Sequence, residues 1–142
     1  MSKLLDTAKA MARGEPPVLQ TVGFSMVSIE PGRAVYEMEA GRKHHNPMGT
    51  VHGGILCDIA DAAMGMAYAA RLEEGESFTT LELKINFLKP VRSGKLRAEG
   101  RVVKAGRTIG LVECDVVDAA GSLVARASST CMTLRGEMAK DR

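Results

Sequence analysis

Residues 54–73 read GILCDIADAAMGMAYAARLE and form one long segment rich in alanine, leucine, isoleucine and methionine. Before its last three residues, its only charged side chains are Asp58 and Asp61. A segment that is apolar on nearly every side is typical of a helix buried within a domain rather than lying on its surface. We therefore predict one long central helix over 54–73, with Gly75 as its C-cap.

Strand patterns lie on both sides of this helix in the sequence. Before it, residues 19–30 and 33–40 favour two strands joined by a turn at Pro31-Gly32. Longer patterns that alternate polar and apolar residues follow the helix, over 78–89, 95–105, 108–118 and 123–134. We interpret these later strands as one antiparallel meander. The order of elements predicts an α+β fold in which a curved antiparallel sheet wraps the long helix.

The composition excludes several classes of protein. The 142 residues predict a single domain, with a helical extension over 1–17, whose helix spans 3–12, and a frayed tail over 136–142. A formal net charge of +2 is too balanced for a dedicated nucleic-acid-binding protein. No run approaches about 18 uncharged apolar residues, so no membrane span is expected. The three cysteines are widely spaced, which favours reduced thiols in the cytoplasm and no metal site.

The start of the helix is the first candidate for chemistry. Residues 41–54, GRKHHNPMGTVHGG, predict an irregular loop that ends at His52-Gly53-Gly54. Glycines let a ligand approach the backbone closely, and the first amides of a helix are unpaired and carry partial positive charge. The pattern fits an oxyanion site for a thioester or ester carbonyl, and equally a plain tight turn.

Asp58 and Asp61 are carboxylates within an apolar helix, and their three-residue spacing places them on roughly one face. Burial raises the pKa of a carboxyl group, which suits a general base or a nucleophile. For Asp61, flanked by alanines and Met64, we favour this functional interpretation. For Asp58 we favour a structural role, either capping a loop amide or pairing with a cation such as Arg33 or Lys43.

The distance along the helix limits how these groups can cooperate. Gly54 and Asp61 are seven residues apart, which is about 10 Å at about 1.5 Å per residue, so one carbonyl cannot touch both in the same helix. If both serve one reaction, they come from two chains. Two antiparallel copies related by a twofold axis would bring them together and give two equivalent sites per dimer.

The loop before the helix holds further polar side chains. Asn46 and His52 can each hydrogen-bond a carbonyl or a water, although an Asn-Pro pair is more typical of a turn start. His44 and His45 are expected to be solvated loop residues. Cys57, one turn into the helix, is expected to pack as a small hydrophobic residue.

Polar groups at the strand ends offer more candidates. Thr79 and Thr80 open the strand over 78–89, and one of them faces the core, where it can position a water, although a threonine in a strand more often has only a structural role. The turns 89–92 (KPVR) and 104–108 (KAGRT) each hold two cations. These cations are expected to be either solvated charges at sheet corners or phosphate contacts.

Three segments with these residues resemble, in order and spacing, the hotdog-fold acyl-CoA thioesterases of the phenylacetate-degradation (PaaI-like) type. They are 45–54 (HNPMGTVHGG) followed by Asp61, 86–90 (NFLKP), and 106–108 (GRT) before a long strand. The resemblance covers roughly residues 18–134. It implies a hotdog fold, in which a sheet wraps a long helix.

The resemblance also implies catalytic roles. Asp61 would be the nucleophile or the general base for water, acting with the loop of the neighbouring subunit. One turn later, related aryl-CoA enzymes can carry a hydroxylated residue where this chain has Gly65, which would change the acyl preference or the position of the water. The amides that polarise the carbonyl in this family would correspond to those of Gly53 and Gly54. The positioning groups would correspond to Asn46 and His52, and the hydroxyl that holds the water to Thr80.

The partners follow from the same resemblance. The substrate would be an acyl-CoA, whose nucleotide phosphates would meet Lys89, Arg92 and Arg107, with Gly106 and Thr108 in the same turn as Arg107. Family members form homodimers that usually pair into homotetramers, and the reaction needs no metal or bound cofactor.

Two other functions stay open on the sequence alone. A hotdog dehydratase or hydratase acting on 3-hydroxyacyl thioesters would also use a histidine and a carboxylate. A non-catalytic acyl-CoA-binding protein would bind without turnover. Release of free thiol distinguishes hydrolysis from both. We favour hydrolysis of an acyl-CoA to a carboxylic acid and CoA, with an active site shared between subunits.

Overall fold

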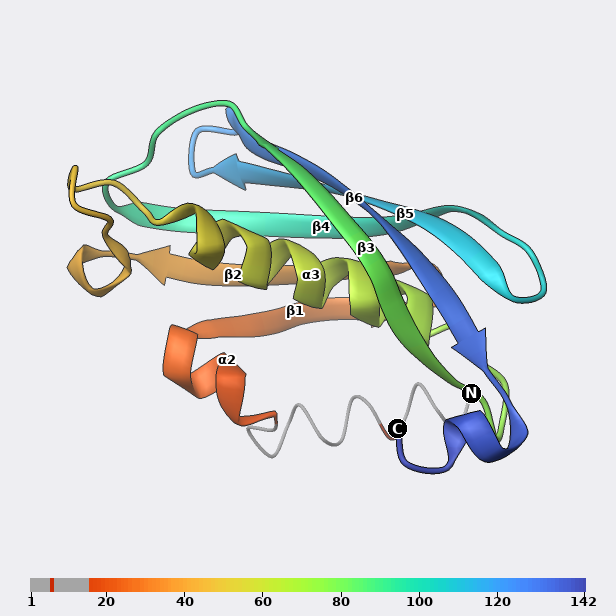
Figure 1. Cartoon of the computed structure of the whole chain (residues 1–142). Coiled ribbons are helices and arrows are strands. Elements are labelled where there is room, and N and C mark those ends of the chain that lie inside the picture. Colours follow the sequence, from red (N-terminus) through yellow and green to blue (C-terminus); the bar gives the residue numbers. More distant parts are fainter. Residues whose placement is uncertain (1–5, 7–15) are drawn as a thin grey trace.

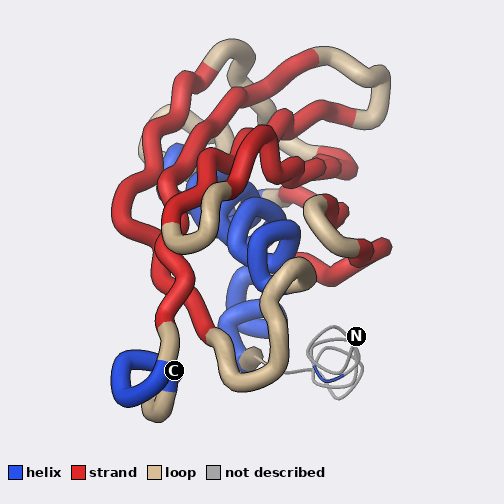
Figure 2. The backbone as a smooth tube through the Cα atoms, turned by 90° about the vertical axis from the view of Figure 1, so that its right-hand side faces the viewer, coloured by secondary structure: helices blue, strands red, loops and turns tan. Residues whose placement is uncertain are grey.

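A single long helix lies against the concave face of one curved sheet (Figure 1). The computed structural model describes residue 6 and residues 16–142, so the helix predicted over 3–12 lies outside the described residues except at residue 6. The long helix is α3 (Gly53–Ala69), and Figure 2 shows the strands curving around it. The predicted α+β architecture, with a central helix wrapped by an antiparallel sheet, is confirmed.

The sheet has six antiparallel strands in the order β1-β2-β4-β5-β6-β3. The expected meander is wrong at β3, which lies at an edge and pairs with β6 instead of β4. The connection over 88–93 contains Pro90 and is longer than a tight hairpin loop, so it carries the chain away from β3 before β4 begins. The strands are β1 (Phe24–Glu30), β2 (Arg33–Ala40), β3 (Ser77–Phe87), β4 (Gly94–Ala105), β5 (Ile109–Asp118) and β6 (Leu123–Leu134).

The expected strand over 19–30 begins later than predicted. Its first residues belong instead to a short helix, α2 (Pro17–Val22), and only Phe24–Glu30 forms a strand. Pro17 occupies the first turn, where its fixed φ suits a helix and its missing N–H costs nothing. Gly23 ends the helix with φ of 94°, a left-handed conformation that favours glycine.

The end of α3 also differs from the prediction. The helix stops at Ala69, and Ala70 rather than Gly75 is its C-cap. The next residues form tight turns, in which the Arg71 N–H donates to the Tyr68 carbonyl and the Leu72 N–H donates to the Ala69 carbonyl. No helix within the described residues is long and apolar enough to cross a membrane. After β6, a short 3-10 helix, η2 (Gly136–Ala139), lies where a frayed tail was predicted.

Gly100 sets the distance between β4 and α3. A Cβ atom at Gly100 would lie 2.4 Å from the backbone oxygen of Ala63, in the middle of α3. Backbone cannot rotate away as a side chain can, so the helix itself would have to shift.

We expect Gly100→Ala to lower the free energy of unfolding by about 1–3 kcal/mol, because overpacking a tight core forces backbone movement. Urea unfolding followed by circular dichroism measures this change. Gly41→Ala is the matched control, because a Cβ at Gly41 meets nothing within 4 Å and the backbone there is extended, with φ of −159°. Equal effects of the two substitutions would contradict the tight contact.

Candidate active site

The loop that leads into α3 is ordered by its histidines. The expectation that His44 is solvated is wrong, because its side chain is 3% exposed. Its Nδ1 accepts a hydrogen bond from the Gly41 N–H at 3.1 Å, so its Nε2 carries the proton and donates to the Val22 carbonyl at 2.6 Å. His45, half-buried, reaches the Arg92 carbonyl at 2.6 Å. These bonds attach the loop to the end of α2 at Val22 and to the β3–β4 connection at Arg92.

Asn46 closes the next turn with its own side chain. Its Oδ1 accepts from the N–H groups of Met48 and Thr50 at 3.0 and 3.1 Å, and its Nδ2 donates to Thr50 Oγ1 at 2.9 Å. The Asn46 side chain therefore has the turn-forming role that is typical of an Asn-Pro pair. An amide nitrogen has two hydrogens, so one Nδ2 hydrogen stays available to a ligand.

His52 and the two glycines form the beginning of α3. His52 is the N-cap, and its Nδ1 accepts from the Gly54 N–H at 2.8 Å. The Ile55 N–H donates to the His52 carbonyl. Among the residues that the structure describes, the Gly53 N–H is the one amide of this turn that has no hydrogen-bond partner. Of the two glycine amides expected to polarise a carbonyl, only that of Gly53 is therefore open.

The tautomer of His52 follows from the same bond. Because Nδ1 accepts a hydrogen bond, the neutral ring carries its proton on Nε2. The side chain is exposed, so Nε2–H is free to donate to a ligand at the helix start.

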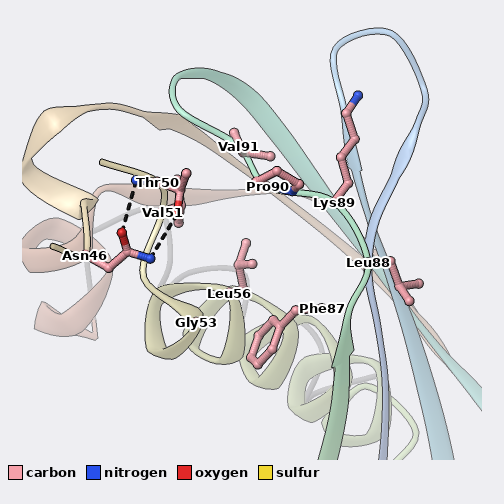
Figure 3. Close-up of a pocket in the computed structure, with 10 residues that line it drawn as sticks. All are labelled: Asn46, Thr50, Val51, Gly53, Leu56, Phe87, Leu88, Lys89, Pro90 and Val91. Carbon is pink, nitrogen blue, oxygen red and sulfur yellow. Dashed lines mark hydrogen bonds between the residues drawn. The ribbon is translucent and has the colours of Figure 1, made fainter. Parts of the chain in front are cut away.

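A cavity of about 410 Å³ lies beside this helix start (Figure 3). The Phe87 ring forms one wall, and a Cβ atom at Gly53 would lie only 2.8 Å from its Cζ. Glycine at this position therefore lets the ring lie next to the backbone that carries the free amide. The cavity is lined by Asn46, Thr50, Val51, Gly53, Leu56, Phe87, Leu88, Lys89, Pro90 and Val91.

Asp58 and Asp61 lie together on the face of α3 that the sheet leaves open. Both are exposed at the surface of the single chain. Loss of hydration raises the pKa of both carboxyl groups, and repulsion from Asp58 raises that of Asp61 further. Of the two structural roles considered for Asp58, pairing with Arg33 or Lys43 is wrong: Arg33 pairs with Glu99, and within residues 16–142 Asp58 makes no ion pair.

Thr80 is the one of the two threonines that shares its face of the sheet with a core residue. It pairs with Cys131 of β6, its Oγ1 is 3.7 Å from Cys131 Sγ, and Cys131 is fully buried. Burial raises the pKa of the Cys131 thiol, and the charge of Asp61 adds to this rise. Cys57, half-buried, also has its pKa raised by burial, then by Asp58 and Asp61.

The repulsion between the two carboxylates makes a prediction about pH. If Asp61 works as an ionised base, kcat/KM falls as the pH drops through its raised pKa. Asp58→Asn removes one cause of that rise, so we expect the acidic limb to move to lower pH.

Profiles of kcat/KM between about pH 4 and pH 8 measure this shift. Glu39→Gln is the control, because Glu39 is an exposed carboxylate on β2, outside the site. An acidic limb that stays in place or moves to higher pH in Asp58→Asn would contradict the assignment.

The cations predicted to meet phosphates do not converge within one chain. Lys89 and Arg92 lie near the helix start, where Lys89 pairs with Asp118 at 2.5 Å and Arg92 Nη1 donates to the Gly49 carbonyl at 3.3 Å. Gly106–Thr108 form the β4–β5 turn at the opposite end of α3 (Figure 1). There the Tyr68 hydroxyl donates to the Thr108 carbonyl at 3.4 Å.

The geometry agrees with what comparison with known proteins finds. A family model described as the thioesterase superfamily matches residues 48–125, which include the loop end, all of α3, and β3 to β5. The chain belongs to the thioesterase superfamily.

Individual superfamily members are similar over most of their length. Human acyl-coenzyme A thioesterase 13 is 30% identical over 131 residues, covering 89% of this chain and 91% of that protein. A thioesterase family protein from Silicibacter pomeroyi is 31% identical, with a TM-score of 0.83 and coverage of 94% and 97%. The PaaI protein of E. coli, from its phenylacetic acid degradation operon, is 25% identical, with a TM-score of 0.85 and coverage of 95% and 96%. The predicted PaaI-like resemblance is confirmed.

Some residues at the site were given no role from the sequence. Phe87 and Leu88 lie in the NFLKP motif, but only the structure shows Phe87 beside Gly53. The small size of residue 53 was a signal that something approaches it, without indicating what. Tyr36 and Met66, which line a second cavity with Asp61, gave no functional signal in the sequence.

Proposed function

We propose that the protein hydrolyses an acyl-CoA thioester to a carboxylic acid and free CoA. The observation that carries this proposal is the unpaired Gly53 amide, which lies at the positive end of α3 in the wall of a cavity large enough for a ligand. A thioester carbonyl oxygen placed there would gain an amide donor as negative charge develops on it. The names of the superfamily relatives support the same reaction class.

The residues have complementary chemical tasks. Asp61, whose pKa is raised, would take a proton from a water while the water oxygen bonds to the carbonyl carbon. The tetrahedral intermediate would then expel the CoA sulfur, which takes up a proton and leaves as the thiol. Direct attack by the Asp61 carboxylate would instead form an anhydride that water hydrolyses. Incorporation of labelled water oxygen into Asp61 in a single turnover indicates the second route.

The active site is proposed to form between two chains. Gly53 and Asp61 are eight residues apart in α3, or about 12 Å along its axis, so one thioester cannot reach both within a chain. The carboxylate side of α3 is the face that the sheet leaves open. β3, an edge strand of 11 residues with Leu81 and Phe87 exposed, offers unpaired backbone groups for a second copy. We expect a homodimer, with pairing of dimers into a tetramer as a further step.

Mixing two inactive variants tests the shared site directly. We expect co-refolded Asp61→Asn and Gly53→Pro chains to recover about a quarter of wild-type activity, because half of the dimers are mixed and each mixed dimer has one intact site. Thiol release by the mixture, compared with each variant alone, measures the recovery. A mixture that is as inactive as its components would show that each site lies within one chain.

A thiol-release assay with acyl-CoA esters of graded size tests the reaction itself. We expect free CoA to appear in equal amounts with the carboxylic acid. Loss or gain of water across a carbon–carbon double bond without thiol release would instead identify a dehydratase or hydratase. Saturable binding without either product would identify a binding protein.

A further inference from the structure

A second cavity, of about 220 Å³, opens beside the two carboxylates of α3. Its walls come from α2, from β1 and β2, and from the carboxylate side of α3. It is mostly apolar, and we call it the Tyr36 cavity. It is lined by Pro16, Val18, Leu19, Phe24, Tyr36, Asp58, Asp61, Ala62 and Met66.

The Tyr36 side chain is the unusual member of this wall. It is 0% exposed, and its ring packs edge-on against Phe24 with the centroids 5.7 Å apart. Its hydroxyl is the only buried side-chain nitrogen or oxygen in the described part of the chain that has no hydrogen-bond partner. The chain's other tyrosine, Tyr68, has its hydroxyl 2.6 Å from Thr133 Oγ1.

An unpaired buried hydroxyl costs stability, because it loses its hydrogen bonds to water on folding and gains none. Phenylalanine would fill the same space without that cost. A buried hydroxyl without a partner calls for an explanation, and here a cavity that can hold a ligand lies against the same side chain. Burial also raises the pKa of Tyr36, so the hydroxyl stays protonated and can act as a donor.

We propose that the Tyr36 cavity binds the acyl group of the thioester, and that the Tyr36 hydroxyl donates a hydrogen bond to an uncharged oxygen on that group, such as a hydroxyl or ketone oxygen. Tyr36 is then a residue that determines specificity rather than a catalytic one. The inference rests on the proposed function for the class of its ligand, since Asp61, the proposed base, lies in the wall of this cavity.

The size and charge of the cavity limit which acyl groups can bind there. A volume of about 220 Å³ exceeds that of an apolar cavity of about 150 Å³ that binds benzene, so it suits a short chain or a single ring. Asp58 and Asp61 face the cavity with negative charge, so an acyl group that ends in a carboxylate is disfavoured.

Entry to the hydroxyl needs a local movement. The Tyr36 hydroxyl is buried, so a neighbouring side chain must move before a ligand reaches it. Met66 is half-buried in the same wall, and its unbranched side chain can change rotamer at little cost.

Binding of non-hydrolysable analogues tests the proposal without depending on turnover. The probes are dethia analogues, in which a methylene replaces the thioester sulfur, of hexanoyl-CoA and its 3- and 5-hydroxy derivatives and of phenylacetyl-CoA and its 3- and 4-hydroxy derivatives. We expect the full-length protein to bind at least one hydroxylated analogue about five- to tenfold more tightly than its parent, as measured by calorimetry. Tyr36→Phe should abolish that preference.

Two controls separate recognition from a structural effect. Tyr68→Phe removes a hydroxyl that already has a partner and is not part of the cavity wall, so the preference for the hydroxylated analogue should persist. In the absence of ligand, Tyr36→Phe should melt at the same temperature as the wild type or higher, because it removes an unsatisfied group.

The proposal is overturned if no hydroxylated analogue is preferred, if the preference survives in Tyr36→Phe, or if Tyr36→Phe lowers the melting temperature. Thiol release from the matching thioesters reports on the proposed function separately. Preference through Tyr36 without thiol release would keep the specificity assignment and reject hydrolysis.

Discussion

Asp61→Asn is expected to lower kcat about 100- to 10,000-fold, the range for loss of a general base. Asparagine keeps the shape of the side chain but cannot take a proton from water or attack the carbonyl. The fold should not suffer. Because its surroundings raise the pKa of Asp61, the charged form is disfavoured in the folded protein, and the neutral amide should leave the melting temperature unchanged or higher.

Thiol release by Asp61→Asn, together with its melting curve, checks both halves of this expectation. Glu39→Gln is again the control for loss of an exposed carboxylate outside the site. Turnover within a few-fold of wild type would reject Asp61 as base and as nucleophile. A large loss of stability would mean instead that the carboxylate has a structural role.

Gly53→Pro is expected to lower kcat about 100- to 1,000-fold relative to Gly53→Ala, as when one oxyanion donor is removed. Gly53 is the first residue of α3, a position where proline suits the helix because the N–H there makes no hydrogen bond within the helix. The preceding residue, His52, already has φ of −60° and ψ of 137°, which a following proline accepts.

Gly53→Ala is the control for the added Cβ atom. Both substitutions place a Cβ about 2.8 Å from Phe87 Cζ, but only proline deletes the N–H and puts a Cδ atom in its place on the nitrogen. The comparison therefore reports the loss of the N–H donor together with the bulk of Cδ at that position. Equal turnover in the two variants would show that the Gly53 amide does not bind the carbonyl oxygen.

The sequence predicted the local elements well because their signals are local. Alternation of polar and apolar residues located β2, β4, β5 and β6 to within about a residue at each end. The failures came where alternation alone misplaces an element. Residues 19–22 were predicted to open a strand, whereas they belong to α2, which begins at Pro17. β3 lies at the edge of the sheet because it pairs with β6, and the paired residues of the two strands are about 50 positions apart in the sequence.

At the candidate site, the sequence determined which groups are present. His52, Gly53, Gly54 and Asp61 are present at fixed spacings along the predicted helix. The distance between Gly54 and Asp61 already required two chains if both act on one carbonyl. Membership of the thioesterase superfamily could likewise be read from short motifs in order.

Only the tertiary structure decided which of these groups are free to act. The Gly54 amide is held by His52 and the Asn46 side chain largely by its own loop, while the Gly53 amide and the Tyr36 hydroxyl have no partner among residues 16–142. The physical reason is that a hydrogen bond needs two atoms at a set distance and angle. A residue's type gives its capacity to donate or accept, but the packing of distant segments decides whether that capacity is already used.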